Sequence, residues 1–212
     1  MSRYDWTLCL VTDRRLAGAR PLPDLVAAAV RGGVTAVQLR EKQCATREFV
    51  ELSRALKTIL APLRIPLIVN DRVDVALAAC ADGVHVGQSD MHWSDVRRLL
   101  GPSAVIGLSV ETLEQALAAP PNVDYLGVGP VFSTSTKTDC GSEWGLAGLA
   151  ALRRASRCQL VAIGGIQCEN AARVAGFGAD GIAVVSAICA APDPELAARA
   201  LRHEFARGRN PI

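Results

Sequence analysis

The sequence predicts a closed (β/α)₈ barrel, the TIM barrel, in a single domain over residues 1–212. Eight short apolar runs alternate with segments of helical spacing, and no linker or low-complexity tract divides the chain. The connections are too long for hairpins, which favours parallel strands. A doubly wound open sheet fits the same alternation, but the regular unit length favours the barrel.

The expected strands are rich in Ala, Val, Leu and Ile, as buried parallel strands are. In chain order these runs begin at Thr7, Ala36, Pro66, Gly83, Val105, Asp124, Gln159 and Gly181. Helical spacing lies between them, clearest at Pro23–Arg31, Thr46–Leu60 and Asp193–Phe205, and gives eight expected helices. Glycines stand where helices should end, at Gly32, Gly33, Gly101 and Gly178.

Composition excludes several classes of protein. An apolar share of 50% is too high for a disordered chain, and a net charge of +2 without a basic run argues against a nucleic-acid partner. The first apolar run is broken at Asp13, so neither a signal peptide nor a membrane span is expected. Seven cysteines without a C-x-x-C motif indicate reduced thiols in a cytoplasm. The expected partners are small molecules, and the oligomeric state stays open.

Polar side chains follow the expected strands at their carboxyl ends, which share one face of a parallel barrel. Gln38, Arg40 and Lys42 have the i, i+2, i+4 spacing that places side chains on one side of a strand. Two cations and an amide suit a polyanion such as pyrophosphate. The alternative is a solvated strand end, where Glu41 balances the charge.

Two carboxylates follow the third and fourth expected strands. Asp71 and Asp90 together suit Mg²⁺, which prefers oxygen ligands and keeps several waters beside substrate phosphates. Separately, Asp71 is also a candidate cap for a helix that begins near Val73, and Asp90 a candidate first residue of a turn. The nearby cations favour the joint interpretation, because metal and cations together neutralise a diphosphate.

The expected phosphate-binding elements lie after the last three strands. The sixth is followed by a loop with four hydroxyl residues and a lysine, namely Ser133, Thr134, Ser135, Thr136 and Lys137. Such a loop can wrap a phosphate, although a plain surface loop has the same composition. Gly164 and Gly165 end the seventh strand, and Val185 and Ser186 end the eighth, where barrels often bind phosphate.

A nucleophilic or zinc mechanism finds no support, because no Ser–His–Asp, Cys–His or zinc-type spacing is present. His85 alternates with Val84 and Val86 inside an expected strand. It is therefore interpreted as an imidazole that lines the core or the mouth, with its hydrogen bonds satisfied, rather than as a base.

Seven segments together resemble the thiamine-phosphate synthase family: VQLREK, IVNDRVDVALA, GVHVGQSD, IGLSV, GVGPVFSTSTK, VAIGGI and GIAVVSAI. The resemblance extends from Leu10 to about Ile188, with the motifs in the family's order. Two departures concern the loop after the sixth strand. Ser133 stands where the family usually has proline, and the segment from Asp139 to Trp144 lacks a proline.

The resemblance implies the substrates, the cofactor and the residues that bind them. The pyrimidine diphosphate is expected at Gln38, Arg40, Lys42, Asn70, Ser109 and Lys137, of which Arg40, Lys42 and Lys137 are the expected catalytic residues. Mg²⁺ is expected at Asp71 and Asp90. The thiazole phosphate is expected at Thr134, Ser135, Thr136, Gly165, Val185 and Ser186.

The implied reaction joins 4-amino-2-methyl-5-hydroxymethylpyrimidine diphosphate to 4-methyl-5-(2-phosphoethyl)thiazole, giving thiamine phosphate and pyrophosphate. A carboxylated thiazole would also release CO₂. The implied route is dissociative, through a pyrimidine cation. Two alternatives remain: an isomerase similar to the thiazole tautomerase, and a non-catalytic barrel that binds a phosphate ligand.

Overall fold

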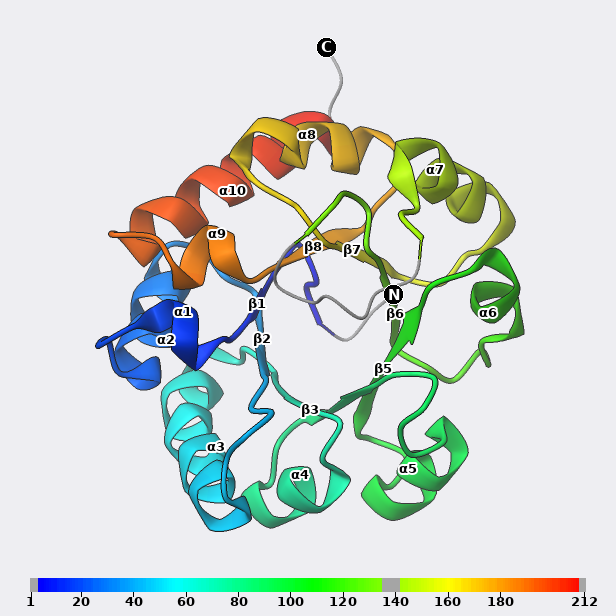
Figure 1. The fold of residues 1–212 in the computed structure, drawn as a ribbon. Helices are drawn as coiled ribbons and strands as arrows, with labels where there is room; N and C mark the ends of the chain where they lie inside the picture. The colour runs from blue at the N-terminus through cyan, green and yellow to red at the C-terminus, as the bar shows by residue number, and fades with distance from the viewer. Residues whose placement is uncertain (1–3, 135–141, 210–212) are drawn as a thin grey trace.

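The computed structural model describes residues 4–134 and 142–209. Eight parallel strands close into one barrel in the order β1 to β8, with β8 paired to β1 (Figure 1). Their bounds are β1 Leu8–Val11, β2 Ala36–Leu39, β3 Leu67–Asn70, β4 Gly83–Val86, β5 Val105–Val110, β6 Tyr125–Val128, β7 Leu160–Ile163 and β8 Gly181–Val184. The predicted barrel and its eight strands are confirmed.

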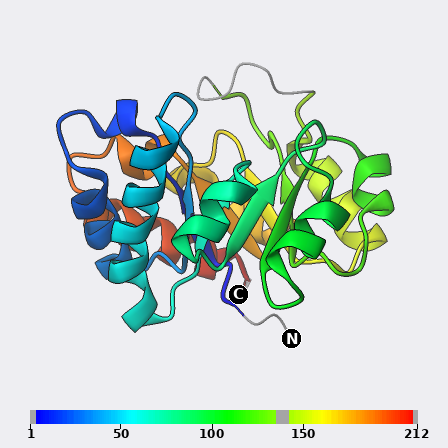
Figure 2. The same cartoon turned by 90° about the horizontal axis from the view of Figure 1, so that it is seen from below.

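The helices surround the strands, as both views of the ribbon show (Figures 1 and 2). They are α1 Arg14–Ala17, α2 Leu22–Arg31, α3 Thr46–Leu60, η1 Ala61–Leu63, α4 Val73–Ala79, α5 Trp93–Leu100, α6 Leu113–Ala118, α7 Gly145–Ala155, α8 Cys168–Gly176, α9 Ser186–Cys189 and α10 Pro194–Arg209. In the described part of the chain, no helix is long and apolar enough to cross a membrane.

The prediction of eight helices was wrong in number. The described residues form ten α-helices and one 3₁₀ helix, because short helices precede the main helix in the first and last units. Asp13 caps α1 by accepting hydrogen bonds from the backbone nitrogens of Arg15 and Leu16. The second short helix, α9, begins at Ser186 directly after β8.

The end of β2 also differs from the prediction. The strand ends at Leu39, so Arg40 and Lys42 lie in the connection to α3 rather than on the strand. Thr12 holds the start of this connection, because its hydroxyl accepts a hydrogen bond of 3.0 Å from the Arg40 backbone nitrogen.

Two hydrophobic clusters form the core. The larger one fills the space between the strands and the helices, and the smaller one lies inside the barrel around Trp6, Ile68 and Tyr125. The rings of Trp6 and Tyr125 pack with centroids 4.3 Å apart. The barrel interior around these rings is therefore filled with side chains.

Candidate active site

A cavity of about 490 Å³ lies at the carboxyl ends of the strands. Its lining includes most of the predicted site residues: Gln38, Arg40, Lys42, Asn70, Asp71, Asp90, Ser109, Thr134, Gly165, Val185 and Ser186. Ser135, Thr136 and Lys137 lie outside the described residues. The fold thus brings together residues that are more than a hundred positions apart in the sequence.

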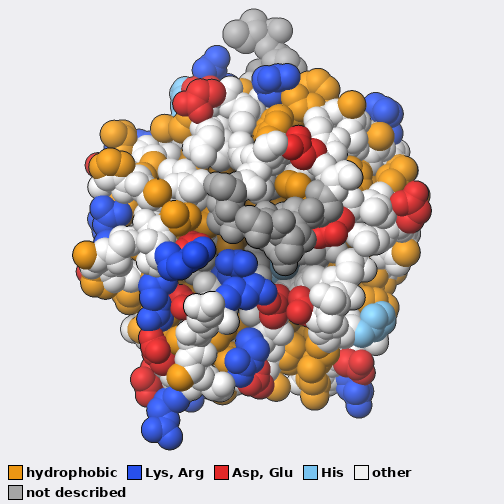
Figure 3. Space-filling model, in the orientation of Figure 1, with side chains coloured by type: hydrophobic (Ala, Val, Ile, Leu, Met, Phe, Trp, Pro, Cys, Tyr) orange, Lys and Arg blue, Asp and Glu red, His pale blue; other side chains and the backbone are white. Residues whose placement is uncertain are grey.

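One side of the cavity is polar and charged. Gln38 is 6% exposed and donates a hydrogen bond of 2.7 Å from Nε2 to Asn70 Oδ1. In the space-filling view, Lys and Arg side chains gather near the centre of this face beside β1 and β2, with Asp and Glu side chains next to them (Figure 3). The surface offers positive charge to an anion and carboxylates to a cation.

Asp71 forms an ion pair with Lys42, one of the cations predicted to bind the diphosphate. Its Oδ2 lies 2.7 Å from Lys42 Nζ, and its backbone has a left-handed φ of 61°. Burial raises the pKa of the Asp71 carboxyl, Lys42 lowers it, and the neighbouring Asp90 carboxylate raises it further. The two carboxylates therefore lie close enough to interact, although a helix separates them in the sequence.

The alternative roles of the two carboxylates have different outcomes. Asp71 does not cap α4, since the N-cap position is Arg72 and no side chain caps it. Asp90 does form a turn: its Oδ2 accepts a hydrogen bond of 2.7 Å from the Gly87 backbone nitrogen.

Among residues 4–134 and 142–209, no group of three His, Cys, Asp or Glu side chains is placed to hold a metal ion. Two carboxylates suffice for Mg²⁺ that binds substrate phosphates and waters as well.

A third carboxylate, that of Glu41, ties the Arg40–Lys42 segment to Arg14 at the start of α1. The side chain of Glu41 is only 7% exposed, and its Oε2 lies 3.3 Å from Arg14 Nε. Arg14 also binds Glu48 on α3, at 2.5 Å. Burial raises the pKa of Glu41, and Arg14 lowers it by a smaller amount. The sequence alone indicated Glu41 only as a charge balance, and its partner Arg14 was not predicted.

The opposite side of the cavity is formed by turns. Gly164 and Gly165 have φ values of 100° and 64°, which glycine adopts at little cost. A Cβ atom at Gly165 would lie 2.6 Å from the Ser133 carbonyl oxygen, so the loop after β6 packs directly on this turn. Val185 and Ser186 complete this side at the start of α9.

His85, Ser109 and Tyr125 form a hydrogen-bonded group in the cavity that was not predicted from the sequence. His85 is 8% exposed and contacts Ser109 through Nε2 and Tyr125 through Nδ1. The interpretation of His85 as a hydrogen-bonded imidazole at the mouth is supported. Tyr125 lies at the first position of β6, where its polar group gave no signal within an apolar run.

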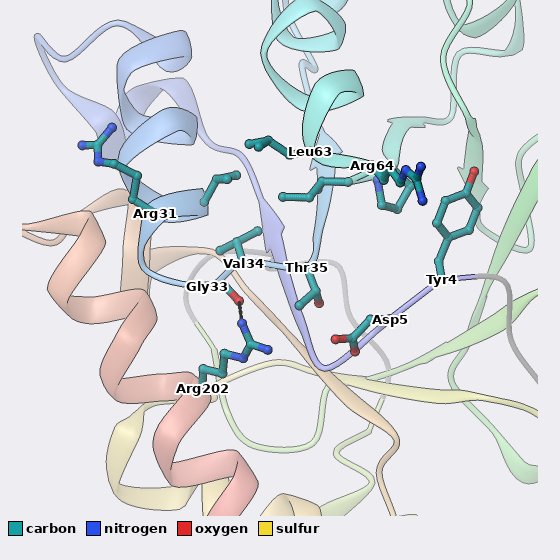
Figure 4. A pocket seen from close by; sticks show the side chains of 12 residues that line it. Tyr4, Asp5, Arg31, Gly33, Val34, Thr35, Leu63, Arg64 and Arg202 are labelled. Carbon is teal, nitrogen blue, oxygen red and sulfur yellow. Dashed lines mark hydrogen bonds between the residues drawn. The ribbon is translucent and has the colours of Figure 1, made fainter.

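A second hollow of about 510 Å³ lies at the other end of the barrel, where β1, β2 and β3 begin. In Figure 4 the side chains of Arg31, Arg64 and Arg202 lie on three different sides of it. Arg31 binds Glu195, and Arg202 donates to the Gly33 carbonyl oxygen. These arginines do not converge on one point, so the cavity at the carboxyl ends is the better candidate for a polyanion.

Comparison with known proteins gives a consistent result. A family model described as "Thiamine monophosphate synthase" matches residues 8–188. The chain is 61% identical to a thiamine-phosphate synthase of Albidiferax ferrireducens over 92% of this chain and 90% of that one. It is 57% identical to a thiamine-phosphate synthase of Xanthobacter autotrophicus over 94% and 95%.

A solved structure shares the fold and much of the sequence. Thiamine phosphate pyrophosphorylase from Pyrococcus furiosus superposes with a TM-score of 0.88 at 39% identity, covering 98% of this chain and 99% of that one. The family match and these relatives agree with the motifs at the barrel mouth. The chain belongs to the thiamine monophosphate synthase family.

Proposed function

We propose that this chain condenses 4-amino-2-methyl-5-hydroxymethylpyrimidine diphosphate with 4-methyl-5-(2-phosphoethyl)thiazole, releasing pyrophosphate and forming thiamine phosphate. Family membership supports the transferase activity. The observation that carries the assignment to a site is the convergence of Arg40, Lys42, Asp71 and Asp90 at one mouth. Cations and carboxylates together fit a diphosphate that binds with a divalent metal ion.

The charged side of the mouth is proposed to bind the diphosphate. Arg40 has a planar guanidinium that can donate two parallel hydrogen bonds to phosphate oxygens, and Lys42 supplies a compact positive charge. Lys137, outside the described residues, is proposed as a third cation for the leaving group. As the C–O bond breaks, negative charge grows on the pyrophosphate, so these cations stabilise the transition state more than the bound substrate.

Asp71 and Asp90 fit Mg²⁺. The Asp90 carboxylate raises the pKa of Asp71, and a cation shared by the two carboxylates would offset this repulsion. Mg²⁺ bound there would supply further positive charge to the leaving pyrophosphate. Lys42 Nζ, now 2.7 Å from Asp71, then becomes available to the diphosphate.

The turn side of the mouth is proposed to bind the phosphate of the thiazole. Thr134 and Ser186 offer hydroxyl groups, and Gly165 allows a phosphate to approach the backbone closely. Ser135, Thr136 and Val185 are assigned to the same phosphate. Binding there would hold the thiazole nitrogen toward the pyrimidine carbon that loses pyrophosphate.

The proposed substitution needs no strong base, because the attacking thiazole nitrogen already carries a lone pair. His85 has both ring nitrogens in hydrogen bonds to neutral hydroxyl groups, which leaves it poorly placed for proton transfer to a substrate. The family match and the relatives named thiamine-phosphate synthase leave the thiazole tautomerase alternative and the non-catalytic barrel without support.

One assay tests the proposal. The purified protein, both phosphorylated substrates and Mg²⁺ should yield thiamine phosphate and pyrophosphate in equal amounts. The Arg40→Ala variant should lose most of this activity, whereas Arg47→Ala, at an exposed position on α3, should keep it. Binding of the substrates without any product would contradict the proposal.

A further inference from the structure

His85 links the buried Tyr125 to Ser109 in the wall of the cavity. Its Nδ1 lies 3.0 Å from the hydroxyl oxygen of Tyr125, and its Nε2 lies 2.8 Å from Ser109 Oγ. Tyr125 is 2% exposed and His85 8%, and both line the cavity together with Ser109. The three side chains thus form a hydrogen-bonded chain in the cavity wall, with the nearly fully buried Tyr125 at one end.

Two glycines make the slot in which the imidazole sits. Gly107 pairs with His85 across β4 and β5, and a Cβ atom there would lie 2.5 Å from His85 Nδ1. A Cβ atom at Gly127, which pairs with Ser109, would lie 2.8 Å from His85 Cε1. Trp6 packs against Tyr125 within the barrel. Both rings are therefore fixed by their surroundings, and their hydrogen-bond geometry is built into the barrel.

The position of the protons follows from the buried phenol. Burial raises the pKa of Tyr125 well above its ordinary value, so the phenol keeps its proton. Within the described residues, the hydroxyl group of Tyr125 has its hydrogen bond with His85 Nδ1. If Nδ1 carried a proton, in either the neutral or the charged imidazole, the buried phenol O–H would have no acceptor there. A buried donor without an acceptor keeps its full desolvation penalty, so Tyr125 donates to Nδ1.

This assignment determines the role of Ser109. With Nδ1 as the acceptor, the imidazole proton is on Nε2 and is donated to Ser109 Oγ. The hydroxyl proton of Ser109 then points away from His85. We infer that Tyr125 and His85 are positioning residues that make the Ser109 hydroxyl a hydrogen-bond donor to an unprotonated ring nitrogen of the pyrimidine. The identity of this ligand rests on the proposed function.

Gln38 offers the complementary polarity. Because its Nε2 donates to Asn70, its carbonyl oxygen Oε1 is the group that can accept from a ligand amino group. An acceptor and a donor in one cavity match the edge of an aminopyrimidine, which carries an amino group beside an unprotonated ring nitrogen. The deaminated 4-oxo pyrimidine reverses both polarities, with a carbonyl oxygen and a protonated nitrogen. The Tyr125–His85–Ser109 chain therefore selects the amino form.

The first experiment measures the protonation of the His85 ring by ¹⁵N NMR on the unliganded protein at neutral pH. The chain has three histidines, so His92→Gln and His203→Gln assign the signals. We expect Nδ1 without a proton and Nε2 with one. Tyr125→Phe should shift the ring toward protonation at Nδ1, because the acceptor is no longer required there. A protonated Nδ1 in the wild-type protein would overturn the inference.

The second experiment measures substrate discrimination. Tyr125→Phe and Ser109→Ala should each raise the KM of the pyrimidine diphosphate about tenfold, the effect of one hydrogen bond, and leave the thiazole KM unchanged. The wild-type protein should bind the amino diphosphate more tightly than its 4-oxo analogue, and Ser109→Ala should lose about tenfold of that preference. Tyr4→Phe, the matched change at the other end of the barrel, should alter none of these values.

The outcomes separate this inference from the proposed function. If the wild-type protein makes no thiamine phosphate, the proposed function fails, while the NMR measurement still decides the protonation of His85. If it does make thiamine phosphate but Tyr125→Phe retains wild-type KM values and discrimination, the positioning role is wrong. Thermal unfolding of each variant checks that it is folded, and Ser109→Ala tests the donor role should Tyr125→Phe not fold.

Discussion

The two sides of the barrel mouth differ in charge. The side formed after β2, β3 and β4 carries full charges, with Lys42 and Asp71 in direct contact and Asp90 beside them. The side formed after β7 and β8 carries glycine turns and a hydroxyl group, at Gly164, Gly165 and Ser186. In the proposed reaction, the charged side binds a diphosphate whose negative charge increases as it leaves. The turn side binds the thiazole phosphate, whose charge does not change during the reaction.

This difference indicates where binding energy contributes to the rate. Full charges beside the leaving group act more on the transition state than on the substrate. Hydroxyl and backbone dipoles around an unchanging phosphate bind substrate and transition state equally, which affects KM rather than kcat.

The largest effect is expected at Lys137, which lies outside the described residues and is proposed as a third cation for the diphosphate. Lys137→Ala should lower kcat about a hundredfold or more, because it would remove the cation proposed to stabilise the leaving group. Lys137→Arg should recover only part of the rate, since a planar fork does not replace a compact ammonium group. Steady-state kinetics at saturating substrates and Mg²⁺ provide the test. A near-normal kcat for Lys137→Ala would identify Lys137 as a solvated loop charge.

The proposed Mg²⁺ site should show the next largest effect. Asp90→Ala should lower activity about tenfold or more at low Mg²⁺, and added Mg²⁺ should restore part of it. The control Asp95→Ala removes an exposed carboxylate that pairs with Arg98 on α5, and it should not change the Mg²⁺ dependence. If Asp90→Ala only lowers stability and keeps normal Mg²⁺ dependence, the turn is its whole role.

On the turn side, Gly165→Ala should raise the KM of the thiazole phosphate and leave that of the pyrimidine diphosphate unchanged. The new Cβ atom meets the Ser133 carbonyl oxygen at a positive φ, so unfolding free energy should also fall by about 1–3 kcal/mol. Gly176→Ala at the end of α8 is the matched control, because its Cβ would have an ordinary contact at 3.7 Å. Equal changes in both KM values would contradict the division.

The smallest effect concerns the stability of the charged side. Burial raises the pKa of Glu41 in the folded protein, so ionisation of Glu41 reduces stability as pH rises from the ordinary carboxyl pKa through the raised one. Glu41→Gln should remove this part of the pH dependence. Urea unfolding between about pH 4 and pH 7 should show the variant gaining stability relative to the wild-type protein as pH rises. A relative loss over that range would show that the attraction of Arg14 outweighs burial.

Much of the fold could be predicted from the sequence, because strands and long helices have distinct periodicities. All eight strands were found, and the predicted range of α3 is the observed one. The four-residue helices α1 and α9 were missed, since they are too short to show a helical period. The end of β2 was placed too late, because Arg40 and Lys42 continue the alternation after the strand has ended.

The candidate site was predictable where polar residues interrupt apolar runs at strand ends, as at Asp71 and Ser186. Its supporting contacts were not. Tyr125 contacts His85 only because β4, β5 and β6 lie in register and Gly107 has no side chain between them. The pairing of Glu41 with Arg14 likewise joins two loops that are adjacent only in the closed barrel.

The most direct test of this division is the single-turnover rate of pyrophosphate release with both substrates saturating, compared between Arg40→Ala and Ser186→Ala. We predict that Arg40→Ala slows release about a hundredfold, and that Ser186→Ala releases pyrophosphate at the wild-type rate and shows only a raised thiazole KM. Slowing of comparable size in both variants, or in Ser186→Ala alone, would contradict the assignment of charge to the leaving diphosphate and of neutral dipoles to the thiazole phosphate.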